Sequence, residues 1–102
     1  MSRIEKIIEM LQSAGKDSFL QHALALEYIK IGQFDEALSQ FVDLLDREPS
    51  YVGSYYHLGK LYEKLNNSDK AIFTYEKGML EAQKIKDQHS YNELMAAKED
   101  LE

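Results

Sequence analysis

The chain has 102 residues, of which 44% are hydrophobic and 29% charged, so it can form one small folded domain and is too apolar for a disordered chain. It has 12 Lys and Arg residues and 18 Asp and Glu residues. The resulting net charge of −6 argues against a general binder of nucleic acid or of anionic membranes. The absence of cysteine excludes disulfides and thiolate chemistry and fits a reducing compartment. Since the sequence shows neither a signal-peptide pattern nor a membrane-spanning apolar run, we expect a cytoplasmic protein.

The first two predicted helices follow from apolar residues that recur at spacings of three and four. In residues 1–14 these are Ile4, Ile7, Ile8 and Leu11. In residues 18–31 they are Leu20, Leu24, Tyr28 and Ile31. Asp17 or Ser18 can cap the second helix by accepting a hydrogen bond from a free backbone N–H. Gly32 can end it, because glycine readily adopts the positive φ found at many helix ends.

The third and fourth helices are predicted over residues 35–47 and 52–65. The third carries Ala37, Leu38, Phe41, Leu44 and Leu45 on one face. Pro49 prevents its continuation, because proline lacks the N–H that a helix interior needs. The fourth carries Tyr55, Leu58, Tyr62 and Leu65. Asn66 stands where Gly32 stood, and asparagine is the next best residue in a left-handed conformation.

The last two helices are predicted from Ser68 onward and over residues 87–101. The fifth helix carries Ala71, Ile72, Tyr75 and Met79, and its end is poorly marked because no proline follows it. Gly78 lies inside it, where glycine costs about 1 kcal/mol relative to alanine, so we expect a close contact with the following helix. The sixth helix carries Tyr91, Leu94, Met95 and Leu101.

A self-similarity of 34 residues connects the four central helices. The residues Leu24, Ala25, Tyr28, Ala37 and Phe41 recur 34 positions later as Leu58, Gly59, Tyr62, Ala71 and Tyr75. The terminal helices fit the same period as half-repeats, so the burial amounts to about three repeats. We therefore predict a single domain over 1–102, with a half-repeat at 1–14, repeats at 18–51 and 52–85, and a capping helix at 87–101.

This pattern resembles the tetratricopeptide repeat. The second copy reads Tyr55-x-x-Leu58-Gly59-x-x-Tyr62, followed by Ala71-x-x-x-Tyr75. The first copy has Gln21 in place of the leading aromatic residue and ends on Pro49. The resemblance implies an all-α fold, a short right-handed α-α superhelix of about six helices, like that of small stand-alone bacterial proteins of this family.

The resemblance also implies a concave groove lined by the first helix of each repeat. The groove positions here are Phe19, His22, Leu26, Ile29, Lys30, Tyr56, Lys60, Lys64, Ser90, Leu94 and Lys98. Some relatives bind the C-terminal carboxylate of chaperones with a clamp of Lys, Arg and Asn. The corresponding residues here are His22, Leu26, His57, Asp87 and Tyr91, which do not form that clamp, and Asp87 would repel a carboxylate.

Two features of these positions allow more than one interpretation. Lys30, Lys64 and Lys98 recur at intervals of 34 and either attract an acidic peptide or simply favour the negative end of each helix dipole. The apolar groove residues either anchor a partner or pack against the N-terminal helix or a neighbouring chain. The histidines lack the spacing of a metal or catalytic site.

We therefore expect a non-catalytic adaptor or scaffold without cofactor or metal, which binds a peptide or helix of a protein partner. The alternative is a structural homodimer whose groove residues are buried between subunits. Neither nucleic acid nor membrane is expected as a partner.

Overall fold

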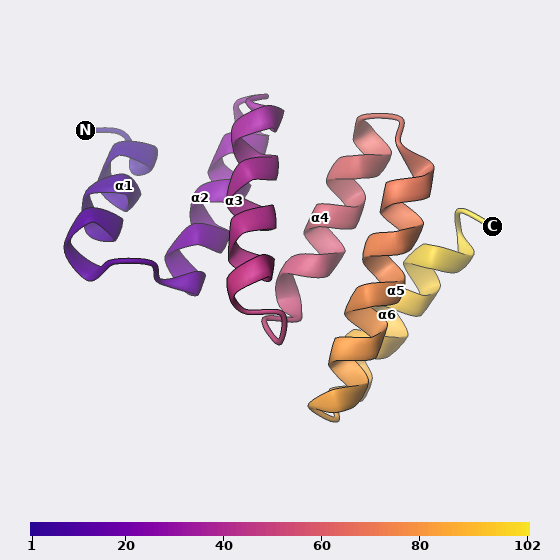
Figure 1. The fold of residues 1–102 in the computed structure, drawn as a ribbon. Helices are drawn as coiled ribbons and strands as arrows, with labels where there is room; N and C mark the ends of the chain where they lie inside the picture. Colours follow the sequence, from indigo (N-terminus) through magenta and orange to yellow (C-terminus); the bar gives the residue numbers. More distant parts are fainter. The chain divides into compact units, whose positions relative to one another are not determined.

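The computed structural model describes residues 1–102 as six helices without any strand, and the chain divides into two compact units (Figure 1). The N-terminal unit, Met1–Glu48, contains α1 (Arg3–Ala14), α2 (Ser18–Lys30) and α3 (Phe34–Arg47). The C-terminal unit, Pro49–Glu102, contains α4 (Gly53–Lys64), α5 (Ser68–Lys84) and α6 (Gln88–Glu99). The all-α prediction and all six predicted helices are confirmed. None of these helices is long and apolar enough to cross a bilayer.

The helix ends follow the predicted local signals. Asp17 caps α2, since its carboxylate accepts a hydrogen bond from the backbone N–H of Leu20 at 2.9 Å. Gly32 and Asn66 both have positive φ, 77° and 60°, as the repeat predicts. Helix α5 runs on to Lys84 because no proline stops it, and the chain then turns at Lys86, which also has a φ of 60°.

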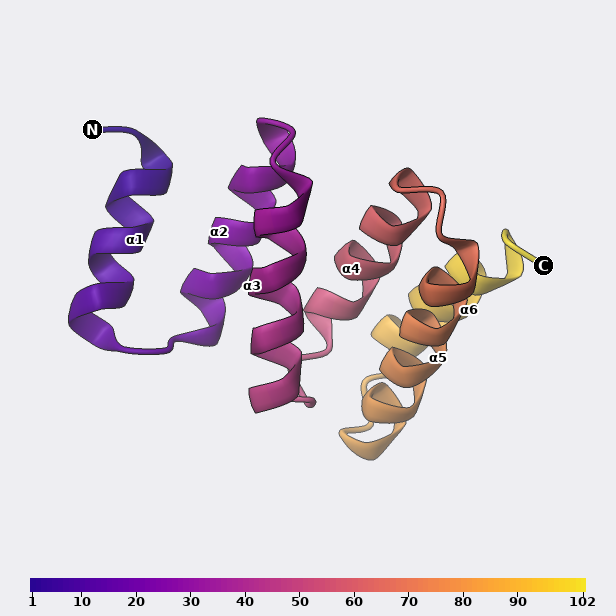
Figure 2. The same ribbon diagram turned by 45° about the horizontal axis from the view of Figure 1, so that its top comes forward.

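In the N-terminal unit α2 lies between α1 and α3 (Figures 1 and 2). The core contains Phe41 and Leu44, which are fully buried, and Ile7, through which α1 packs on α2. Ala25 and Ala37 are buried completely. The predicted place of Ile31 in the apolar stripe is wrong, because α2 ends at Lys30 and leaves Ile31 exposed.

In the C-terminal unit α5 packs against both α4 and α6. Gly59 and Gly78 permit this close packing of α5 on its neighbours. A Cβ on Gly59 would lie 2.1 Å from a ring carbon of Tyr75, and a Cβ on Gly78 would lie 2.6 Å from Tyr55 and 2.8 Å from Leu94. The close contact expected at Gly78 is thus confirmed with α6 and extends to α4.

Candidate partner-binding surfaces

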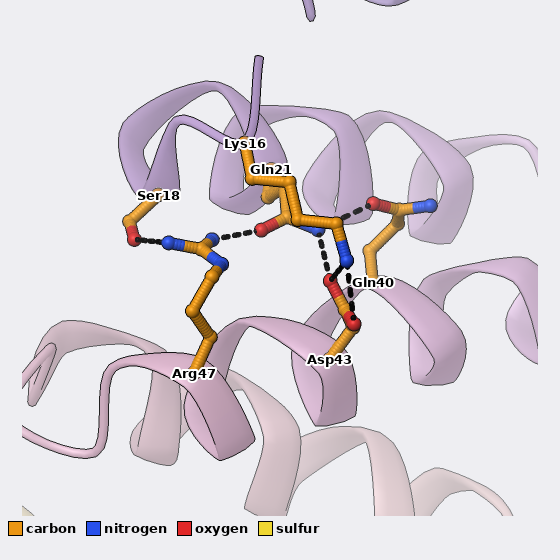
Figure 3. A network of polar contacts seen from close by, with 6 residues as sticks. All are labelled: Lys16, Ser18, Gln21, Gln40, Asp43 and Arg47. Carbon is orange, nitrogen blue, oxygen red and sulfur yellow. Dashed lines mark hydrogen bonds and ion pairs between the residues drawn. The ribbon is translucent and has the colours of Figure 1, made fainter.

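A polar network joins α2 to α3 in the N-terminal unit (Figure 3). The buried Gln21 amide donates to Asp43 at 2.9 Å and to Gln40 at 3.3 Å, and its oxygen accepts from Arg47. Lys16 pairs with Asp43 at 3.3 Å. The hydrogen bond from Gln21, followed by that from Lys16, lowers the pKa of Asp43.

The network extends to the N-terminus of α2. Arg47 donates to the Ser18 hydroxyl at 3.2 Å, and Ser18 donates to Glu48 at 2.6 Å. No buried side-chain nitrogen or oxygen of the chain lacks a hydrogen-bond partner. Because its buried polar groups are satisfied internally, the network holds α2 against α3.

Four of the predicted groove residues lie on α2 at spacings of three and four: Phe19, His22, Leu26 and Ile29. Phe19 is 68% exposed, whereas the other three are half-buried. The centres of the His22 and Phe41 rings lie 5.7 Å apart in an edge-to-face arrangement, so the His22 ring packs against α3. This face of α2 therefore combines one exposed aromatic ring with supported apolar side chains.

Lys30, at the end of α2, has an ionic partner. Its ammonium lies 2.9 Å from Glu27, which also pairs with Arg3 of α1 at 3.3 Å. The hydrogen bond from Lys30 lowers the pKa of Glu27. This residue of the predicted lysine ladder thus takes part in the attachment of α1 to α2.

In the C-terminal unit the predicted residues Tyr56 and Lys60 form a small cluster on α4. The Lys60 ammonium lies 5.5 Å from the centre of the Tyr56 ring and 3.5 Å from Glu63. The Tyr75 hydroxyl, from α5, donates to the same carboxylate. Burial and this hydrogen bond raise the pKa of Tyr75, which keeps its hydroxyl protonated as a donor. Lys64 is exposed at the end of the same helix.

One of the three α6 positions does not match the prediction of a groove lining. Leu94 is 1% exposed and packs beside Gly78, so its predicted place on a binding surface is wrong. Lys98 lies 3.4 Å from Glu76 of α5 and 3.7 Å from Glu102. Ser90, the third position, is half-buried, and its hydroxyl donates to Asp87 at 2.7 Å within the N-terminal cap of α6.

The structure also shows a surface that the sequence interpretation missed. A hollow of about 580 Å³ lies between α5 and α6. It is lined by Phe73, Glu76, Lys77, Met79, Leu80, Gln83, Tyr91 and Lys98. Phe73 is 69% exposed and Leu80 is 58% exposed. The 34-residue repeat could have indicated Phe73 and Leu80, because the corresponding residues 34 positions earlier, Ser39 and Asp46, are polar.

No group of three or more His, Asp or Glu side chains lies close enough together to hold a metal ion. His57, on α4, has its pKa lowered by burial, an effect that Glu93 opposes. Its ring meets the Tyr56 ring edge to face at 5.7 Å.

Comparison with known proteins gives a consistent result. Residues 28–97 match the family model of the tetratricopeptide repeat. The solution structure of a tetratricopeptide repeat domain protein from Salinibacter ruber is 44% identical with a TM-score of 0.82, and the match covers 85% of this chain and 88% of that one. Protein BPP2914 from Bordetella parapertussis is 28% identical with a TM-score of 0.84, covering 99% and 88%.

The fold is also similar to that of MamA, at 19% identity and a TM-score of 0.69, over 96% of this chain and 64% of that one. No curated protein matches the sequence.

Proposed function

The chain belongs to the tetratricopeptide repeat family, and from this we propose that it is an adaptor or scaffold that binds a peptide or a helix of a partner protein. Proteins of this family generally mediate protein–protein interactions, and the family is generally non-catalytic. The partner contacts would lie on the first helix of each repeat. They comprise the α2 face with Phe19 and Leu26 and the α4 cluster with Tyr56 and Lys60.

The observation that carries this proposal is the exposed Phe19 ring on α2. The Phe19 ring is 68% exposed, so most of its apolar area lies in water. The same face of α2 also carries half-buried apolar side chains, which extend this apolar surface. Aromatic side chains supply much of the binding energy at protein interfaces. A partner that covers this face gains that energy with little ordering cost, because the helix already exists.

The Tyr56 and Lys60 cluster supports the same proposal in the C-terminal unit. A tyrosine beside an ammonium can bury its ring against an apolar side chain while Lys60 contacts an acidic group. We therefore expect a partner segment that combines apolar side chains with Asp or Glu.

The test is capture of partners from the native cytoplasm by immobilised protein. We expect the double variant Tyr56→Ala with Leu26→Ala to recover at least about tenfold less partner, since each removes an apolar anchor. Its helix content by circular dichroism should stay unchanged. Val42→Ala, which trims an exposed apolar residue on α3, is the matched control and should capture normally. Undiminished capture by the folded double variant would place the binding site elsewhere.

A homodimer that buries these same faces is the alternative function. Sedimentation of the Tyr56→Ala and Leu26→Ala variant separates the two. If the faces bind a different protein, the variant and the wild-type chain sediment alike. If the faces join two copies, the variant loses mass relative to the wild-type chain at equal concentration.

A further inference from the structure

The Tyr56 and Lys60 cluster of α4 is connected to the core of the C-terminal unit by polar contacts. The Tyr75 side chain of α5 is fully buried, and its hydroxyl donates to the Glu63 carboxylate of α4. Glu63 in turn pairs with the Lys60 ammonium at 3.5 Å. Lys60 lies 5.5 Å from the centre of the Tyr56 ring. A continuous series of contacts therefore leads from a buried hydroxyl to the surface cluster.

The geometry of α4 allows this series. Tyr56 and Lys60 are four residues apart, as are Gly59 and Glu63, so the members of each pair lie one helical turn apart. The Tyr75 ring packs on the backbone at Gly59, where an added Cβ would lie 2.1 Å from a ring carbon. The absence of a side chain at Gly59 therefore lets the ring lie close to α4, with its hydroxyl at Glu63.

The first repeat has none of these polar contacts. The four corresponding positions, 34 residues earlier, lack the hydroxyl, the carboxylate and the ammonium group and hold Phe41, Ile29, Leu26 and His22. Phe41 is fully buried, as Tyr75 is, so packing of the ring does not require a hydroxyl at this position. The hydroxyl is present in the repeat that has a carboxylate to receive it and absent from the other one. This pairing indicates that the hydroxyl acts on the carboxylate.

The Tyr75 hydroxyl is suited to holding a carboxylate in place. A hydrogen bond to an ionised acceptor is stronger than one between neutral groups. Burial, and then the hydrogen bond with Glu63, raise the pKa of Tyr75, so the hydroxyl keeps its proton and remains a donor. The hydroxyl and the Lys60 ammonium both contact the same oxygen, Oε2 of Glu63. Glu63 therefore connects the two groups directly.

We propose that Tyr75 is a positioning residue for the binding of a partner protein at α4. Its buried hydroxyl fixes the Glu63 carboxylate, which holds the Lys60 side chain beside the Tyr56 ring before the partner binds. This role rests on the proposed function, because it concerns the same surface cluster. Ordering a lysine side chain costs conformational entropy, and a partner that meets an ordered Lys60 does not have to supply that cost.

The first test measures the order of Lys60 by NMR without any partner. Because the Lys60 side chain lies beside the Tyr56 ring, the ring current should displace the signals of its protons. We expect Tyr75→Phe to move these signals toward those of an unstructured lysine. The variant should fold, because the first repeat buries Phe41 at the corresponding position.

The matched control is Tyr55→Phe, which removes another buried hydroxyl from the same unit. That hydroxyl donates to the carbonyl of Pro49, and it has no contact with Glu63. A purely structural role of the two hydroxyls predicts a similar loss of stability in both variants and no difference at Lys60. We expect the Lys60 signals of Tyr55→Phe to stay as in the wild-type chain.

The second test asks whether the effect of Tyr75 passes through Glu63. Glu63→Gln removes the charge that holds the Lys60 ammonium, so by itself it should release the Lys60 side chain. In the Glu63→Gln background Tyr75→Phe should change the Lys60 signals no further, since the two residues act in one series.

The third test measures the affinity for the partner that the wild-type chain captures in the experiment above. We expect Tyr75→Phe to raise its Kd about threefold to tenfold, although the buried Tyr75 cannot touch the partner. Tyr55→Phe should stay within about twofold of the wild-type Kd. In a Lys60→Ala background Tyr75→Phe should have no further effect on the Kd.

Lys60 signals that do not respond to Tyr75→Phe would overturn the proposal, as would a Kd that Tyr75→Phe and Tyr55→Phe raise equally. Failure of the proposed function gives a different result. If the variant Tyr56→Ala with Leu26→Ala captures its partner normally, the proposed function is wrong, and the role of Tyr75 in binding falls with it. If that variant loses its partner while Tyr75→Phe binds as the wild-type chain does, only the positioning role is wrong.

Discussion

At the scale of single residues, a size difference between the two repeats explains the glycine at position 78. Tyr55 and Gly78 in the C-terminal unit correspond to Gln21 and Leu44 in the N-terminal unit. In the first repeat the larger residue is Leu44, on α3. In the second repeat it is Tyr55, on α4, and glycine stands in the position of Leu44. Tyr55 fills the space at Gly78, and its hydroxyl donates to the carbonyl of Pro49 at 2.7 Å. Burial of this ring raises the pKa of Tyr55 to about 12. Gln21 instead holds the polar network between α2 and α3.

The contact at Gly59 gives a residue-scale prediction. We expect Gly59→Ala to lower the free energy of unfolding by about 1–3 kcal/mol, because its Cβ would overlap the buried Tyr75 ring. That cost exceeds the gain of about 1 kcal/mol from better helix propensity. Chemical denaturation measures the change. Gly53→Ala is the matched control, since nothing lies within 4 Å of its added Cβ, and it should not destabilise the protein.

Lys86 gives a prediction of opposite sign. It has a φ of 60°, where a Cβ is unfavourable by about 1 kcal/mol, and it lies just beyond the end of α5. We expect Lys86→Gly to raise the free energy of unfolding by about 0.5–1 kcal/mol. Gln83→Gly, inside the last turn of α5, should lower it by about 1 kcal/mol. A destabilised Lys86→Gly variant would show that the lysine side chain matters more than its backbone conformation.

At the scale of the helices, α1 is attached to the N-terminal unit by a narrow set of contacts. Ile7 is buried in the core, and Arg3 pairs with Glu27 of α2. We expect Ile7→Ala to cost about 2–4 kcal/mol of unfolding free energy, because it leaves a cavity between α1 and α2. Deletion of residues 1–14 should lower the midpoint of thermal unfolding further.

The control for this helix is Met10→Ala, an exposed position on α1, which should change stability by less than about 0.5 kcal/mol. An unaltered melting temperature after the deletion would show that α1 contributes nothing to the unit. Circular dichroism during heating measures all three variants.

At the scale of the whole molecule, several carboxylates have lowered pKa values and so make stability depend on pH. The pKa of Glu81 is lowered by Lys77 and Lys84, and that of Asp87 by Ser90, in addition to Glu27 and Asp43. The folded-state pKa of each lies below its unfolded value of 4.5 or 3.8. Their stabilisation is therefore present above those unfolded values and is lost as pH falls through the folded ones.

We therefore expect the midpoint of thermal unfolding to begin to fall below about pH 6.5, because the lowered pKa of His57 lets the unfolded chain bind a proton first. It should fall more steeply below about pH 4.5, where the carboxylates lose their stabilisation. Glu81→Gln should flatten this fall, because the amide cannot titrate, while it lowers stability at neutral pH. A midpoint that does not change down to about pH 3 would contradict the assignment of these ion pairs.

The sequence by itself determined the helices, the cap of α2 and the family, because helix periodicity, capping residues and the 34-residue repeat are local or regular signals. The positive φ of Asn66 and the close contact at Gly78 were predictable for the same reason. Only the tertiary structure decided which side chains meet across helices. It buried Leu94 beside Gly78 and brought Lys98 to Glu76. The repeat could have indicated the exposure of Phe73 and Leu80, whose positions in α3 are polar. It could not indicate which side chains meet across helices, because burial depends on residues distant along the chain, which the pattern of a single helix does not include.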